Sequence, residues 1–172
     1  VIECMPAETE IERRDRAIVA FIFVTGARDG AVPSFKMKHL RIADRTLEQD
    51  AREVTTKASK TFTSWFFPVG EDIVAILEDW VTYLRQTNLW GDDDPIFPAT
   101  EMGLDVENRF EVKGLARKHW SGAGTIRKVF RAAFEGAGLP YFHPHSFRRT
   151  LALLGQTLCA TPEKYKAWRQ NL

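Results

Sequence analysis

The fold and the chemistry of this chain are both predicted from one stretch, His143-Pro144-His145-Ser146-Phe147-Arg148-Arg149-Thr150. Pro144 holds the residue before it in an extended conformation. Apolar residues then recur at helical spacing, which predicts one face of a helix, namely Phe147, Leu151, Leu154 and Leu158. Because His145 and Arg148 are three residues apart, they share a face of the first helical turn.

A helix N-terminus is positively polarised, so an imidazole and a guanidinium at that position suit a phosphate oxyanion. The structural alternative is that His145 caps the helix and Arg148 pairs with a carboxylate. An isolated His-x-x-Arg pattern favours this alternative, because only two residues are specified. Whether His145 and Arg148 bind a phosphate or have a structural role therefore has to be decided from the other segments of the chain.

Length and composition predict a single soluble domain over residues 1–172, with residues 1–11 as a linker-like lead-in. Hydrophobic residues make up 44% of the chain and charged residues 27%, which is ordinary for a globular protein. We see neither a membrane-spanning run nor a signal peptide. Cys4 and Cys159 lack metal-ligand spacing, so we expect reduced thiols, no structural metal and a cytoplasmic location.

The net charge of +1 conceals two halves of opposite sign. Residues 1–107 contain 12 Lys and Arg against 20 Asp and Glu, a net charge of −8. Residues 108–172 contain 12 against 3, a net charge of +9. The second half is therefore predicted to bind a polyanion, unless the two halves simply pair with each other in the fold.

Periodicity predicts a mainly helical α+β fold. The helical segments are residues 12–24, 73–84, 125–138, 145–158 and 162–172. Three short strands, at residues 39–43, 46–54 and 61–69, predict a small antiparallel sheet. Residues 90–108 are acidic and rich in turn residues, so we expect a solvated loop. A metal site at Asp92-Asp93-Asp94 is disfavoured, because alternate ligand spacing is absent.

Three further segments carry candidate residues. Thr25-Gly26 ends the first helix, and Arg28 follows, either as a ligand-binding group or as a cation that satisfies helix carbonyls. Lys57-Ala58-Ser59-Lys60 is predicted to be a hairpin turn that presents one or two ammonium groups. A basic helix face could follow a nucleic-acid backbone or simply be solvated, and it consists of Arg127, Lys128 and Arg131.

Taken together, these segments resemble the catalytic domain of the tyrosine recombinases, the phage integrase family. The matching segments are Thr25-Gly26-Ala27-Arg28, the turn lysine Lys57, Pro95-Ile96-Phe97-Pro98, His145 to Thr150, and Asn171-Leu172, which resembles the start of a Leu-Gly-His segment. Ala31 stands where the family often carries an acidic residue. The resemblance extends over nearly the whole chain.

The resemblance implies a site-specific DNA recombinase or integrase that cuts and rejoins DNA through a covalent 3′-phosphotyrosine. Arg28 and Arg148 would clamp the phosphate, Lys57 would protonate the departing 5′ oxygen, and His145 would assist. No cofactor or metal would be required. The expected DNA contacts are Lys60, Arg127, Lys128, Arg131 and Arg149.

The resemblance also implies a fragment that is inactive by itself. The nucleophilic tyrosine and a second histidine are expected beyond Leu172, and the family's N-terminal DNA-clamping domain is expected to be missing. The expected partners are double-stranded DNA and further copies of the chain on that DNA, in a bacterial, phage or mobile-element setting. The alternatives are a non-catalytic DNA- or partner-binding module derived from an integrase and, less favoured, a metal-dependent nuclease that uses the acidic loop.

Overall fold

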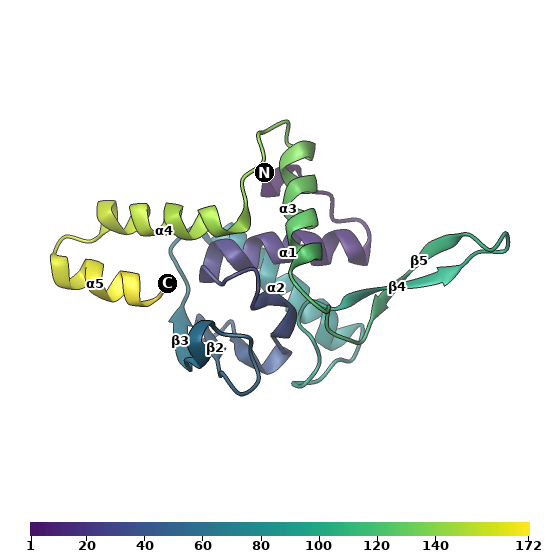
Figure 1. The fold of residues 1–172 in the computed structure, drawn as a ribbon, viewed down its shortest axis with the longest axis horizontal. Helices are drawn as coiled ribbons and strands as arrows, with labels where there is room; N and C mark the ends of the chain where they lie inside the picture. Colours follow the sequence, from purple (N-terminus) through teal and green to yellow (C-terminus); the bar gives the residue numbers. More distant parts are fainter.

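The computed structural model describes residues 1–172, apart from the side chain of Lys57. Helices dominate the described chain and are accompanied by two small antiparallel sheets (Figure 1). The helices are α1 (Glu10–Thr25), α2 (Glu71–Gln86), α3 (Gly124–Gly136), α4 (Pro144–Leu158) and α5 (Pro162–Gln170). The predicted α+β, mainly helical fold class is confirmed.

The first sheet is the predicted three-stranded one, in the order β1 (Leu40–Arg41), β2 (Thr46–Gln49) and β3 (Phe62–Trp65). Its strands are shorter than predicted, because β2 ends at Gln49, which pairs with Phe62. Residues 50–61 therefore form a longer connection than the tight hairpin turn we expected. It contains the 3-10 turn Lys57–Ser59, in which Ala58 and Ser59 adopt positive φ angles.

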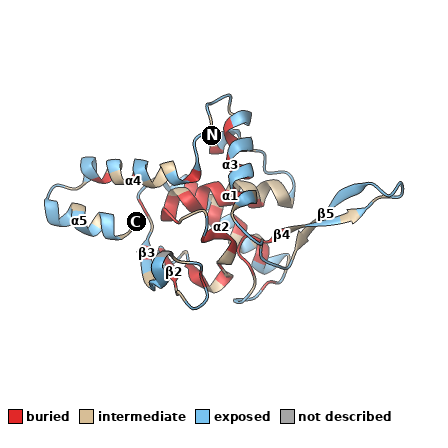
Figure 2. Cartoon of the chain, in the orientation of Figure 1, coloured by how far each residue is buried: buried red, intermediate tan, exposed pale blue. Residues whose placement is uncertain are grey.

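Helix α1 lies at the centre of the fold, and most of its length is buried (Figure 2). Its N-terminus is stabilised by a capping box, in which the Thr9 side chain accepts from the Glu12 N–H and Glu12 accepts from the Thr9 N–H. Helices α2, α3 and α4 all contact it. Residues 17–24 of α1 are apolar on every side of the helix, which allows this part to be surrounded by other elements.

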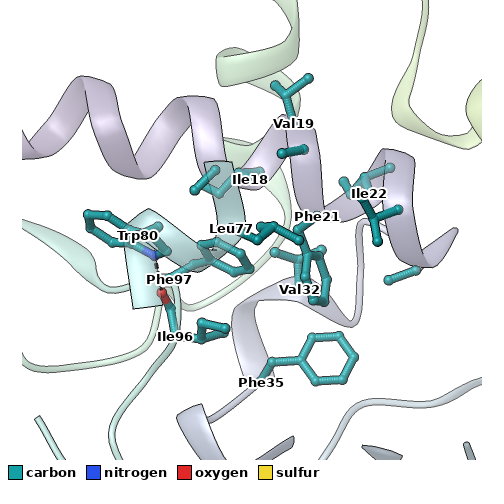
Figure 3. Packing of buried hydrophobic residues seen from close by; sticks show 14 of the residues in the cluster. Ile18, Val19, Phe21, Ile22, Val32, Phe35, Leu77, Trp80, Ile96 and Phe97 are labelled. Carbon is teal, nitrogen blue, oxygen red and sulfur yellow. Dashed lines mark hydrogen bonds between the residues drawn. The ribbon is translucent and has the colours of Figure 1, made fainter. Parts of the chain in front are cut away.

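The core beside α1 combines aromatic and aliphatic side chains (Figure 3). Phe21 of α1 packs edge to face against Phe35 and Phe97, with ring centroids 5.3 and 5.1 Å apart. Trp80 of α2 is buried, and its indole N–H donates to the Ile96 carbonyl at 2.9 Å. The Pro95-Ile96-Phe97-Pro98 segment is thus a core anchor between α1 and α2.

The sequence-based prediction was wrong for the segment between α2 and α3. Part of the expected solvated loop forms β4 (Ala99–Leu104), which pairs with β5 (Phe110–Ala116) in a hairpin that projects from the body (Figure 1). We call this hairpin the β4–β5 arm. The apolar residues of the arm face solvent, and its turn is rich in charged residues. A strand is recognised in a sequence when one face is apolar and buried against the core, and this segment does not meet that condition.

The lead-in also differs from the expected linker. Ile2 is buried in the 3-10 turn Ile2–Cys4, which contacts α1 and α3, and α1 already begins at Glu10.

Candidate active site

Two distant segments meet at the C-terminal end of α1. Gly26 ends this helix in the left-handed conformation, with φ +62°. A Cβ atom at this position would lie 2.8 Å from Leu172 Cδ2 and 3.2 Å from Leu151 Cδ1. Glycine therefore serves both the helix end and the close approach of α4 and the chain end. From α4, the Arg148 guanidinium donates to the Gly26 carbonyl.

Arg28 and Arg148 come together at this junction. The pKa of Arg148 falls to about 10, first because the guanidinium is largely buried and second because the positive charge of Arg28 is close. No carboxylate among the described residues offsets this shift. Arg148 remains charged at neutral pH, so two positive charges lie close together and favour the binding of an anion beside them.

An open pocket of about 420 Å³ extends from Arg28 toward the sheet. Its lining residues come from the loop after α1, from the β2–β3 connection with the start of β3, and from the C-terminal end of the chain, and they are Arg28, Ala58, Lys60, Thr61, Phe62, Gln170 and Leu172. The side chain of Lys57, our predicted general acid, lies outside the described part of the structure. Lys60 is the ammonium group that the structure places in the pocket.

His143, rather than His145, caps α4. The Nδ1 atom of His143 accepts from the His145 N–H at 3.1 Å, so this nitrogen carries no proton. The His145 side chain is exposed and lies three residues before Arg148 on the same helix. The alternative interpretation, in which His145 caps the helix and Arg148 pairs with a carboxylate, is therefore wrong. The cap is His143, and Arg148 donates to a backbone carbonyl.

Comparison with known proteins shows the family of this chain. The family model described as "Phage integrase family" matches residues 3–154. This chain belongs to the phage integrase family. A comparison with curated protein sequences gives no match.

Two solved structures are similar to this integrase-family chain. The XerA recombinase has 18% sequence identity and a TM-score of 0.60, over 95% of this chain and 54% of that one. The integrase from mycobacterium phage Brujita has 17% identity and a TM-score of 0.52, over 93% and 52%. The chain thus spans about half the length of these structures, and at such identities the likeness shows a shared recombinase-like fold. None of the helices described is long and apolar enough to cross a membrane.

Asp29 lies next to Arg28 in the candidate site, and the sequence analysis missed it. Its Oδ2 atom lies 2.8 Å from Arg127 Nε of α3 and 3.8 Å from His143 Nε2 at the start of α4. The carboxylate thus connects the Arg28 loop to both helices. Its position next to the Thr-Gly-x-Arg segment was the available signal, but we expected the family's acidic residue at Ala31.

We expect Asp29→Asn to lower the free energy of unfolding by about 1–2 kcal/mol, because the mostly buried Asp29 side chain holds a cation. Asp44→Asn is the control, since Asp44 is exposed and its change should stay within about 0.5 kcal/mol. Urea denaturation of both variants measures the difference. Equal effects would show that the Asp29 bridge contributes nothing to stability.

The predicted DNA contacts have different surroundings. Lys128 and Arg149 are exposed. Arg131 lies over the Tyr141 ring with its Cζ atom 4.5 Å from the centroid, and Arg127 is held by Asp29. Three of these four side chains therefore retain cationic groups that are not used in an observed ion pair.

The three consecutive aspartates after α2 form ion pairs with neighbouring cations. Asp92 pairs with Arg85, Asp93 with Lys36 and Lys38, and Asp94 with Arg117. Among the described residues no cluster of three His, Cys, Asp or Glu side chains could hold a metal ion. These contacts assign the carboxylates a structural role in tying the loop to the body.

Proposed function

We propose that this chain is the catalytic domain of a site-specific DNA recombinase that cuts and rejoins DNA through a covalent 3′-phosphotyrosine. The observation that carries the proposal is that Arg28 lies close to the largely buried Arg148, whose charge no carboxylate among the described residues offsets. Two guanidiniums in a partly desolvated site are suited to the charge that builds on the non-bridging oxygens of a phosphodiester.

The remaining groups fit the proton transfers of this reaction. A tyrosine oxygen would attack phosphorus, and the bond to the 5′ oxygen would break. The departing oxygen needs a proton, which Lys57 would supply, with Lys60 in the pocket as the second candidate. His145 would hold the phosphate or assist the transfer. The two arginines supply the charge stabilisation that a metal gives in other nucleases.

We further propose that the nucleophile comes from outside residues 1–172. Tyr83 donates its hydroxyl to Glu10 at 3.1 Å, and burial raises its pKa. Tyr141 packs beneath Arg131. Tyr165 lies beside Arg169 on α5. Within the part of the chain that the structure describes, none of these hydroxyls forms a hydrogen bond with Arg28 or Arg148.

The end of α5 is well placed to deliver such a nucleophile. The Asn171 side-chain amide accepts from the Trp65 N–H at 2.6 Å and donates to the Trp65 carbonyl at 2.7 Å. It therefore binds the edge of β3 as a neighbouring strand would, and Leu172 lies at the pocket with Arg28. A segment that continues from this point would start beside the phosphate clamp.

A suicide DNA substrate tests the proposal. We expect residues 1–172 alone to form no covalent adduct, and a chain extended by about one or two helical turns and a short loop to form one. The readout is a denaturant-resistant protein–DNA band. If the 172-residue chain forms the band, the nucleophile is one of the three tyrosines discussed above. If the extended chain never does, the protein is a binding module.

We also propose that the basic residues of α3 and α4 bind the backbone of duplex DNA, on which several copies would assemble. Binding by the 172-residue chain should be weak, sequence-tolerant and steeply salt-dependent. The double substitution Lys128→Ala with Arg149→Ala should reduce the magnitude of the log–log salt slope by about 1–2. The control is Arg41→Ala, because Arg41 pairs with Glu48 on the sheet. Fluorescence anisotropy over a salt series measures the slope, and an unchanged slope would contradict the assignment.

A further inference from the structure

The β4–β5 arm has one apolar face that the described residues leave uncovered. Met102 pairs with Val112, and Leu104 with Phe110, so four apolar side chains lie on the same side of the ribbon. Each is more than half exposed, and Phe110 is 81% exposed. The opposite side carries the Glu111–Lys113 ion pair, with Lys113 lying over Gly103. The arm is thus an amphipathic ribbon without a partner.

The base of the arm is anchored to the body. Arg14, which is buried, donates to the Pro98 carbonyl at 3.1 Å and to Thr100 Oγ1 at 2.9 Å. On the other strand, Glu10 accepts from the Leu115 N–H at 3.0 Å. These contacts fix the base of the ribbon to α1. A two-stranded ribbon is marginal alone, and an exposed apolar patch of this kind is typical of an interaction site.

The net negative charge of the arm favours a protein partner and disfavours a nucleic acid. Residues 99–116 contain four carboxylates and two cations. Both cations are used within the arm, because Lys113 pairs with Glu111 and Arg109 pairs with Asp105 and Glu107. A net negative ribbon is repelled by phosphates, so its partner should combine an apolar hollow with positive charge.

The chain itself offers such a surface at its other end. One face of α5 forms an open hollow of about 340 Å³, lined by Pro162, Tyr165, Lys166, Arg169 and Gln170. It provides an aromatic ring and two cations, which complement Phe110 and the arm's carboxylates. The arm and α5 lie at opposite ends of the molecule (Figure 1). The arm therefore cannot contact α5 of its own copy, but it can contact α5 of a neighbouring copy.

We propose that the β4–β5 arm docks on α5 of a second copy of this chain, with Phe110 in the hollow and the arm's carboxylates near Lys166 and Arg169. Such a contact joins two different surfaces and is head-to-tail, so it builds rings or open chains. The hollow shares Gln170 with the pocket that Arg28 lines. A docked arm would therefore lie next to the candidate active site of its neighbour.

The first test measures self-association without DNA, so its outcome is independent of the proposed recombinase activity. Sedimentation velocity at concentrations up to about 300 µM covers the weak range expected for a small interface. Phe110→Ser should weaken association at least about tenfold, as for an aromatic anchor. Lys113→Ser, on the opposite side of the ribbon, should not weaken it. Both side chains are exposed, and circular dichroism verifies that the variants fold.

The second test identifies the docking surface. In a Cys4→Ser, Cys159→Ser background, chains carrying Phe110→Cys are mixed with chains carrying Lys166→Cys and oxidised. A mixed disulfide dimer is expected, and Lys113→Cys in place of Phe110→Cys should not form it. The proposal is overturned if the chain stays monomeric, if only arm-to-arm dimers form, or if Phe110→Ser weakens DNA binding without changing association.

Discussion

Arg148→Ala in the extended chain should reduce covalent adduct formation by about 10²–10³-fold, which is the cost of removing one group that stabilises an oxyanion in the transition state. The side chain also donates to the Gly26 carbonyl. Its loss therefore removes both half of the proposed phosphate clamp and the link between α4 and the end of α1. The measurement is the single-turnover rate on the suicide substrate at saturating protein.

Arg149→Ala is the matched control for this experiment. Arg149 is the next residue on the same helix and is exposed, so its loss should weaken DNA affinity while leaving the saturated rate within a few-fold of the original. Arg148→Lys keeps the charge but lacks the planar fork of guanidinium donors, and it should recover only a small part of the rate. If Arg148→Ala retains full activity, the phosphate clamp does not include this residue.

Trp80→Ala should lower the free energy of unfolding by about 3–5 kcal/mol, the usual cost of removing a fully buried aromatic side chain. Trp80 is 1% exposed, and its N–H satisfies the Ile96 carbonyl (Figure 3). The substitution leaves both a cavity and an unpaired carbonyl. Trp80→Phe is the comparison, since it refills most of the volume and loses mainly the hydrogen bond, at about 1–2 kcal/mol.

Urea denaturation followed by circular dichroism measures both Trp80 variants. Tyr83→Phe is a useful second control, because Tyr83 is on the same helix as Trp80 and the change removes a partly exposed hydrogen bond to Glu10 of α1. We expect it to cost no more than about 1 kcal/mol. An equal loss in Tyr83→Phe and Trp80→Ala would contradict the assignment of the Pro95-Ile96-Phe97-Pro98 segment as a core anchor.

Several parts of the fold could be predicted because their signals are local. The helix over residues 144–158 follows from a proline and a periodic apolar run, and the end of α1 follows from Gly26, which adopts the left-handed conformation. The order of the family segments identified the fold class. Such features depend on residues a few positions apart, so backbone geometry and periodicity are sufficient to recognise them.

The β4–β5 arm could not be predicted in the same way. Its apolar side chains face solvent, whereas a prediction from alternation assumes that one face is buried in the same chain. Asp29 was missed for a related reason, because the distances to Arg127 and His143 depend on how α3 and α4 pack. Neither partner is close to Asp29 in the sequence.

The sequence by itself thus determined the helical architecture, the segments that resemble a recombinase and the charge difference between the two halves. Only the tertiary structure decided which cations lie close together. Arg28 and Arg148 are separated by most of the chain. Because the Arg148 guanidinium is largely buried beside Arg28, the binding of an anion there is electrostatically favourable. The electrostatic cost of bringing two like charges together depends on their distance and on solvent access, and both are properties of the packed fold.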